Sequence, residues 1–164
     1  ALPEVVCDTS PLQYLHQAGL LHILPALVKQ VIVPPAVQEE IEVGKAQGVD
    51  LPELGALRWL RVEAPQTMAA LPLINDLGPG EAQVLMLALE HDEAVVVLDD
   101  GLARRVAEML EIPLTGTLGL LLDAKKAGLI AHVGPVLDQL EALRFRVAPH
   151  TRAAVLQLVG EQHE

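Results

Sequence analysis

Residues 94–100 read AVVVLDD, and this stretch decides the fold. Val95 to Leu98 are apolar and three of these four residues are β-branched, which is typical of a strand buried on both faces. Desolvating the two adjacent carboxylates that follow would be costly inside a core. We therefore place Asp99 and Asp100 at the carboxyl end of a parallel strand, where open α/β sheets bind ligands. The pair indicates a hard-cation site, and capping of the next helix is the simpler alternative.

A second unit of strand followed by acid begins the chain. Residues 4–8 read EVVCD, a short apolar stretch that again ends in an aspartate, Asp8. Ser10 and Pro11 are predicted to be the N-cap and the first residue of a helix that stops at Gly19. Because parallel strands end at one edge of a sheet, we expect Asp8 near the later acidic pair. The alternative role for Asp8 is turn formation together with Ser10.

Strand and helix signals alternate along the rest of the chain. Strands are predicted at residues 31–33, 57–62 and 112–114, with an edge strand at 145–147. Helices are predicted at residues 20–28, from residue 35, and at 79–90, 101–110, 118–127, 134–143 and 149–160, with a loop at 44–55. The alternation predicts an α/β fold with a mainly parallel sheet covered on both faces, in one domain over residues 1–164.

The amino-acid composition disfavours several classes of function. The chain has 22 Asp and Glu residues against 11 Lys and Arg, and its net charge of −11 opposes general polyanion binding unless metal ions and a local basic rim reverse the potential. Aromatic residues make up 2%, which disfavours a base-stacking module. The single Cys7 excludes an internal disulfide and fits a reducing cytosol. Without a signal peptide or a membrane-spanning run, we expect a cytoplasmic protein with no membrane partner.

Two glutamates are expected near the same sheet edge. Glu81 falls in the first turn of the helix at 79–90, where the helix dipole favours a carboxylate. Glu40 lies near the start of the helix that begins at Pro35, close to the carboxyl end of the preceding strand. Spacing alone does not choose between Glu39 and Glu40, and the simpler alternative for both is an ordinary solvated face.

The acidic residues suggest one cluster that binds divalent ions. Several carboxylates brought together repel strongly, and Mg²⁺ or Mn²⁺ relieves this because hard cations prefer oxygen ligands. Such ions position and ionise a water and stabilise charge on a phosphodiester. The spacing of the six histidines gives no zinc-helix motif, and neither a serine-nucleophile elbow nor a phosphate-cradling loop is present. The members of the predicted cluster are Asp8, Glu40, Glu81, Asp99 and Asp100.

Four hydroxyls and one arginine are the other candidates for the site. Thr9 or Ser10 is placed to orient the water or to hold a metal-bound one. Thr115 and Thr117 flank a glycine, so their loop either brings donors close to a ligand or caps the next helix, with capping favoured for Thr117. Arg104 is either solvated or, beside an acidic site, in contact with phosphate.

Five motifs, in their order and spacing, resemble the PIN domain superfamily, and most closely its poorly characterised, toxin-like prokaryotic branch. The resemblance covers residues 8 to about 145. The motifs are DTSP from Asp8, VPPAV from Val33 with Glu40 after it, LGPGE ending at Glu81, LDDGLAR ending at Arg104, and GTLG from Gly116.

This resemblance implies a three-layer α/β/α sandwich and a Mg²⁺- or Mn²⁺-dependent endoribonuclease acting on single-stranded or structured RNA. It implies a homodimer and, for toxin members, a small antitoxin that holds the nuclease inactive. The alternative is a PIN-like binding or regulatory module without catalysis. A haloacid-type phosphohydrolase ranks last, because Ser10 stands where its Asp-x-Asp motif needs an aspartate. The family acids fall on Asp8, Glu40, Glu81 and Asp100 with Asp99 beside them, and the expected metal ligands are Asp8, Glu81, Asp99 and Asp100.

Overall fold

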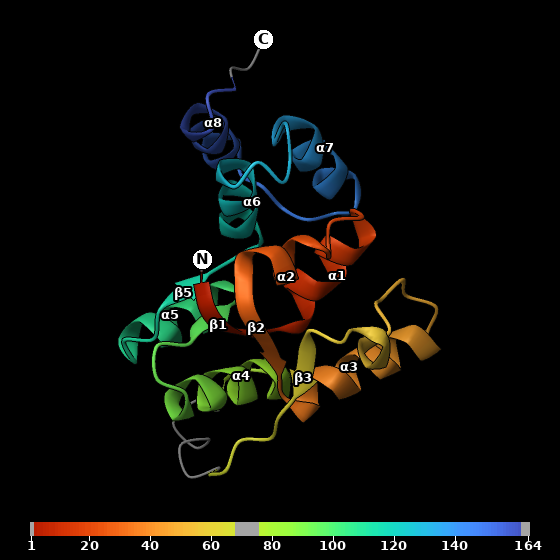
Figure 1. Ribbon diagram of the computed structural model, residues 1–164, viewed down its shortest axis with the longest axis vertical. Coiled ribbons are helices and arrows are strands. Elements are labelled where there is room, and N and C mark those ends of the chain that lie inside the picture. Colours follow the sequence, from red (N-terminus) through yellow and green to blue (C-terminus); the bar gives the residue numbers. More distant parts are fainter. Residues whose placement is uncertain (1, 68–75, 162–164) are drawn as a thin grey trace.

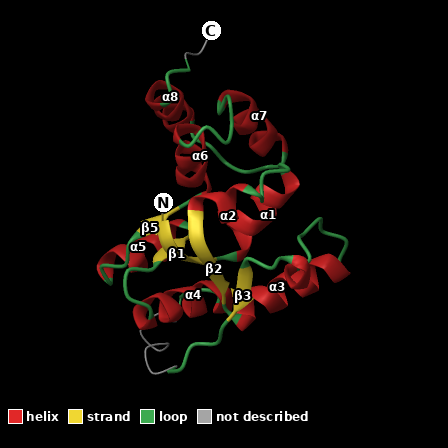
Figure 2. Cartoon of the chain, in the orientation of Figure 1, coloured by secondary structure: helices red, strands yellow, loops and turns green. Residues whose placement is uncertain are grey.

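One parallel sheet forms the centre of the protein. The computed structural model describes residues 2–67 and 76–161, and in this part of the chain five strands pair in parallel. Their order across the sheet is β3-β2-β1-β4-β5, so β1 is central with β4 beside it. Figures 1 and 2 show the strands between the helices. The strands are β1 (Leu2–Cys7), β2 (Val28–Val33), β3 (Leu60–Val62), β4 (Val95–Val97) and β5 (Leu114–Thr115).

Helices cover both faces of this sheet (Figure 1). Helix α4 contacts β1 and β4, α2 contacts β2, and α6 packs against α1 and α2. Helix α3 contacts both α1 and α4, and α6, α7 and α8 gather at one end of the molecule (Figure 1). The helices are α1 (Thr9–Gln17), α2 (Ile23–Leu27), α3 (Pro35–Ala46), α4 (Pro79–Glu90), α5 (Gly101–Met109), α6 (Thr117–Lys126), α7 (Gly134–Ala142) and α8 (Pro149–Leu158), with a short 3₁₀ turn η1 (Leu54–Ala56).

The register of β1 against β4 brings the two strand-then-acid units together. Cys7 pairs with Val97, and the Asp8 N–H donates to the Val97 carbonyl at 3.2 Å. Val6 and Val96, which pair one step earlier, are fully buried, and burying a valine contributes roughly 1.5–3 kcal/mol to folding. The apolar strands are thereby fixed in the core, and the acids that follow them emerge at one edge.

The predicted fold class is confirmed, and several local predictions are wrong. Helix α1 begins at Thr9 with Asp8 as its N-cap residue, because the Ser10 hydroxyl donates to a distant carboxylate instead of capping the helix. Helix α3 continues to Ala46, beyond the start of the predicted loop at 44–55. Residues 145–147 form no strand, because the chain turns at Arg144, whose φ is 72°. The sequence pattern of residues 66–74 is too weak to predict a helix or a strand. Residues 68–75 lie outside the described part of the chain.

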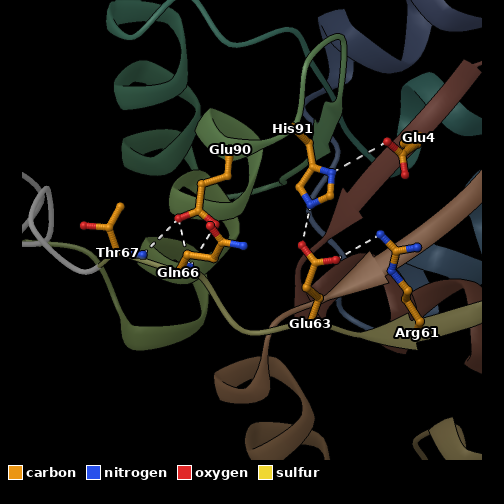
Figure 3. A network of polar contacts seen from close by, with 7 residues as sticks. All are labelled: Glu4, Arg61, Glu63, Gln66, Thr67, Glu90 and His91. Carbon is orange, nitrogen blue, oxygen red and sulfur yellow. Dashed lines mark hydrogen bonds and ion pairs between the residues drawn. The ribbon is translucent and has the colours of Figure 1, made fainter.

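A polar network ties the end of α4 to two strands (Figure 3). His91 lies between two carboxylates: its Nδ1 is 3.7 Å from Glu4 Oε1, and its Nε2 contacts Glu63 Oε2. Arg61 Nη2 also donates to Glu63, at 2.9 Å. Glu90 accepts hydrogen bonds from the backbone N–H groups of the segment after β3, those of Gln66 and Thr67. Helix α4, which carries Glu81 in its first turn, is therefore anchored at its far end.

Within residues 2–67 and 76–161, none of the helices has the length and apolar character needed to cross a bilayer.

Candidate active site

Asp8 is a buried carboxylate at the carboxyl end of β1. Only 6% of the residue is exposed, and the pKa of its carboxyl is raised from 3.8 to about 6. Burial is the largest cause of the rise, a hydrogen bond from the Thr9 backbone opposes it, and the nearby charges of Glu40, Asp99 and Asp100 add to it. A carboxyl with this pKa is partly protonated near neutral pH, so the site gains from any cation that offsets its charge.

Asp99 follows β4 and is held by side chains from two helices. Its Oδ1 accepts the Thr117 N–H at 2.8 Å and its Oδ2 accepts the Thr117 hydroxyl at 2.7 Å. The Ser10 hydroxyl also donates to Oδ2, at 3.3 Å. Asp99 therefore joins the starts of α1 and α6 at the strand edge. The predicted capping role of Thr117 is wrong, because Gly116 is the N-cap residue and the Thr117 hydroxyl is used on Asp99.

Asp100 and Glu81 form an interacting pair of carboxyls. Asp100 is the N-cap of α5, and its Oδ2 accepts the Ala103 N–H at 3.0 Å. The pKa of Glu81 is raised to about 7, chiefly by burial and also by the charges of Asp8, Asp100 and Glu40 and a hydrogen bond with Asp100. The simpler alternative, that one of the aspartates caps the next helix, is therefore correct for Asp100, which caps α5 through Oδ2. Asp100 also lines the pocket with the other acids.

Glu40, and not Glu39, points its carboxylate at this edge of the sheet. Its Oε2 accepts the Thr9 hydroxyl at 2.6 Å, and its Oε1 accepts the Gly80 N–H at 3.2 Å. A Cβ added at Gly80 would lie 2.6 Å from Oε1, so a glycine permits this approach. Glu40 therefore links the starts of α1 and α4.

Four of the five predicted acids line a pocket of about 400 Å³, and Glu40 is not among its lining residues. Four of the residues that line the pocket were not predicted from the sequence: Tyr14, Arg144, Phe145 and Arg146. The last three reach the pocket through the turn after α7, which local periodicity does not predict. Tyr14 could have been proposed, because it lies on the helix that begins at the Asp8 motif. The residues that line the pocket are Asp8, Ser10, Tyr14, Glu81, Asp99, Asp100, Arg144, Phe145 and Arg146.

Arg104 and Thr115, two of the predicted substrate-binding residues, do not line this pocket. Arg104 Nη1 donates to the Leu98 carbonyl at 2.8 Å, and this guanidinium also lies beside Gly116. The Thr115 hydroxyl lies over Gly119 in the first turn of α6. Neither residue lines the pocket, so direct contact with substrate stays a prediction for both.

The donor set suits a hard divalent cation. All four predicted metal ligands, Asp8, Glu81, Asp99 and Asp100, line the pocket and offer only carboxylate oxygens. The raised pKa values of Asp8 and Glu81 report the desolvation and repulsion that a cation relieves. Within the described residues, no three His, Cys, Asp or Glu side chains already stand as a group that could hold a metal ion.

Comparison with known families agrees with this architecture. A family model described as PIN domain, DUF3368, matches residues 4–161. The match spans nearly all of the chain, which therefore belongs to this PIN domain family. PIN domains are generally nucleases and generally use divalent metal ions. No curated protein matches the sequence. The predicted superfamily is confirmed, and the toxin-like branch stays a prediction.

Proposed function

We propose that this protein is a Mg²⁺- or Mn²⁺-dependent endoribonuclease that hydrolyses RNA phosphodiester bonds. The observation that carries the proposal is the meeting of Asp8, Glu81, Asp99 and Asp100 in one pocket. They come from three places in the chain: the end of β1, the first turn of α4, and the two adjacent residues that precede α5. A structural role alone does not require four carboxylates to share one pocket, since each costs free energy to desolvate.

The pocket residues have distinct parts in this proposal. Asp8, Glu81, Asp99 and Asp100 would hold the cation, which supplies an ionised water and charge stabilisation at the phosphodiester. Without a cation, the raised pKa values leave Asp8 and Glu81 partly protonated near neutral pH, and a bound cation would displace these protons. Thr9 keeps Glu40 in place, and Thr117 and Ser10 keep Asp99 in place. These fixed carboxylates would orient the ligands around the ion.

The proposal is tested with isosteric changes at two of the acids. The parent protein with Mn²⁺ is expected to cleave a labelled RNA, and Asp8→Asn and Asp100→Asn are expected to remove this activity. Asparagine is as good an N-cap as aspartate, so Asp100→Asn keeps helix α5 capped. Asp92→Asn, at an exposed site before β4, removes the same charge away from the pocket and is the matched control.

Direct metal binding separates the nuclease from its alternative. Saturable Mn²⁺ binding that is lost in Asp8→Asn, together with RNA turnover, would support the proposal. Metal or partner binding without turnover on single-stranded, structured or transfer RNA would favour the catalytically inactive binding module. Full cleavage by both variants would overturn the assignment of the acids. The homodimer and the antitoxin stay predictions.

A further inference from the structure

Residues 144–146, between α7 and α8, bring two free guanidiniums to the acidic pocket. Arg144 and Arg146 are exposed and line the pocket with the carboxylates. Among the described residues, neither side chain forms a hydrogen bond or salt bridge. Arg152, by contrast, binds Asp138 and Glu141. Two unpaired positive charges beside a group of carboxylates are available to an anion that enters the pocket.

Arg144 has a left-handed backbone conformation after α7, as Glu111 has after α5 with φ of 59°. The Arg144 N–H donates to Glu141 O at 3.0 Å and the Phe145 N–H to Leu140 O at 2.9 Å, which places Arg144 at the left-handed position after α7. Glycine is preferred there because a Cβ is unfavourable at positive φ. Gly19, Gly128 and Gly160 take this position after other helices, with φ of 72°, 76° and 74°. Folding alone therefore favours glycine where the chain has Arg144.

An aromatic pair lines the same pocket as the arginines and the acids. The Tyr14 and Phe145 rings meet edge to face, with centroids 5.0 Å apart and an interplanar angle of 79°. Both side chains are partly exposed and both line the pocket. The sequence has one Tyr, one Phe and one Trp, so two of its three aromatic residues are at this site. An aromatic ring beside a guanidinium suits a nucleotide, which combines a base with a phosphate.

We propose that residues 144–146 bind single-stranded RNA at the pocket, with Arg144 and Arg146 on its phosphates and the Phe145–Tyr14 pair on an unpaired base. The inference rests on the proposed nuclease function and assigns residues of this chain to the binding of its substrate. Guanidiniums form charge-assisted, often bidentate hydrogen bonds with phosphate, which offset the repulsion from the carboxylates. The pocket, about 400 Å³, has the size of a small-ligand site and suits one nucleotide. A paired base cannot offer its face to a ring, so a duplex would lose this contact.

The first experiment measures binding without cleavage. Fluorescence anisotropy of a labelled single-stranded RNA is recorded in Ca²⁺, which takes the same oxygen ligands as the proposed cofactor. The double variant Arg144→Gln/Arg146→Gln is expected to bind more weakly, with a log affinity–log salt slope smaller by about 1.4, or about 0.7 for each lost phosphate contact. The two single variants, Arg144→Gln and Arg146→Gln, are measured beside Arg58→Gln, which removes one positive charge from an exposed position that does not line the pocket. Arg58→Gln is expected to bind RNA as the parent does.

The second experiment examines the base contact and the catalytic step. Phe145→Leu is expected to weaken single-strand binding roughly 5- to 150-fold, the range found for stacked bases, and to leave weak duplex binding unchanged. In Mn²⁺, the arginine variants are expected to raise KM more than they lower kcat, and Arg144→Lys to restore part of the loss. Arg144→Gly should bind RNA weakly while keeping the parent's melting temperature, because glycine suits the left-handed backbone.

The outcomes separate this inference from the nuclease proposal. Mn²⁺-dependent cleavage with unchanged KM and salt slope in the double variant overturns the inference and leaves the nuclease intact. RNA binding that depends on the arginines without any cleavage supports the inference and overturns the nuclease. A parent protein that binds no single-stranded RNA overturns the inference. Equal losses of single-strand and duplex binding in Phe145→Leu overturn the base contact.

Discussion

Asp99 and Thr117 are joined by two hydrogen bonds that hold the carboxyl end of β4 to the start of α6. The Thr117 N–H donates to Asp99 Oδ1 at 2.8 Å, and the Thr117 hydroxyl donates to Oδ2 at 2.7 Å. Thr117 is fully buried, so both donors are fixed by packing. Asp99 thereby supplies the acceptor that the first N–H of α6 needs and still lines the pocket. Asp99 therefore stabilises the start of α6 and also lines the pocket. Changing Thr117 tests the first of these roles without removing the Asp99 carboxylate from the pocket.

Thr117→Val should lower the free energy of unfolding by about 1.5–3 kcal/mol, the range for a hydrogen bond to a charged group. Valine keeps the shape and leaves the backbone N–H, but Asp99 loses its hydroxyl donor. Urea denaturation measures the change. Thr151→Val in α8 is the control, because the Thr151 side chain makes no hydrogen bond within the described residues, and it should stay within about 0.5 kcal/mol of the parent. Equal effects at both positions would contradict the structural role of Asp99.

Asp8 should make the metal-free protein less stable as the pH rises. Its pKa is about 6 in the folded protein and 3.8 for an ordinary, unperturbed aspartate, so the folded state binds this proton more tightly than the unfolded state does. The contribution of Asp8 is therefore most favourable below about pH 4 and becomes unfavourable as the pH rises through 6. The penalty at neutral pH is at most on the order of 3 kcal/mol, since one pKa unit corresponds to about 1.4 kcal/mol.

Unfolding of the parent and Asp8→Asn in a chelator, from pH 4 to pH 8, measures this effect. The stability of the variant relative to the parent is expected to increase with pH, whereas Asp92→Asn should give a flat difference. Loss of other contacts at position 8 would shift the Asp8→Asn curve without changing its slope. A difference that does not change with pH would show that Asp8 has no raised pKa.

Glu40→Ala should weaken Mn²⁺ binding about 10- to 100-fold, as the loss of residues that orient metal ligands commonly does. Glu40 holds the Thr9 hydroxyl and the Gly80 N–H beside the pocket, so its removal loosens the starts of two helices. Glu39→Ala removes the same charge from the neighbouring exposed position and should leave Mn²⁺ binding unchanged. Titration calorimetry compares the two variants. Weaker Mn²⁺ binding in Glu39→Ala than in Glu40→Ala would instead place Glu39 at the site.

Glu63→Gln should destabilise the protein at neutral pH and lose this effect in acid. The contact with His91, followed by the nearby charges of His91 and Arg61, lowers the pKa of Glu63 below 4.5. A lowered acid pKa stabilises the folded state above the unfolded pKa, and this stabilisation is lost as the pH falls through the folded pKa. Thermal unfolding at pH 7 and pH 3.5 measures it, with the exposed Glu108→Gln as control. A melting temperature equally lowered at both pH values would rule out an electrostatic origin.

Several elements of the fold could be predicted because their signals are local. The apolar run before Asp99 specified a buried strand, and the Pro79 start of α4 specified both its first turn and the place of Glu81. The left-handed turn after α1 followed from Gly19, whose φ is 72°. The predicted edge strand at 145–147 is wrong because the chain turns at Arg144, and Phe145 then packs against Tyr14, which is distant in sequence.

The sequence by itself determined the α/β class, the PIN-like motifs and the acids that end buried strands, because hydrophobic periodicity and the cost of burying charge act over a few residues. Only the tertiary structure decided between Glu39 and Glu40, gave Asp99 and Asp100 different partners, and brought Arg144 and Phe145 to the acids. Those choices depend on pairs such as Ser10 and Asp99, which are 89 positions apart and meet only when the packed helices and the strand register bring them together. No local pattern encodes such a distance.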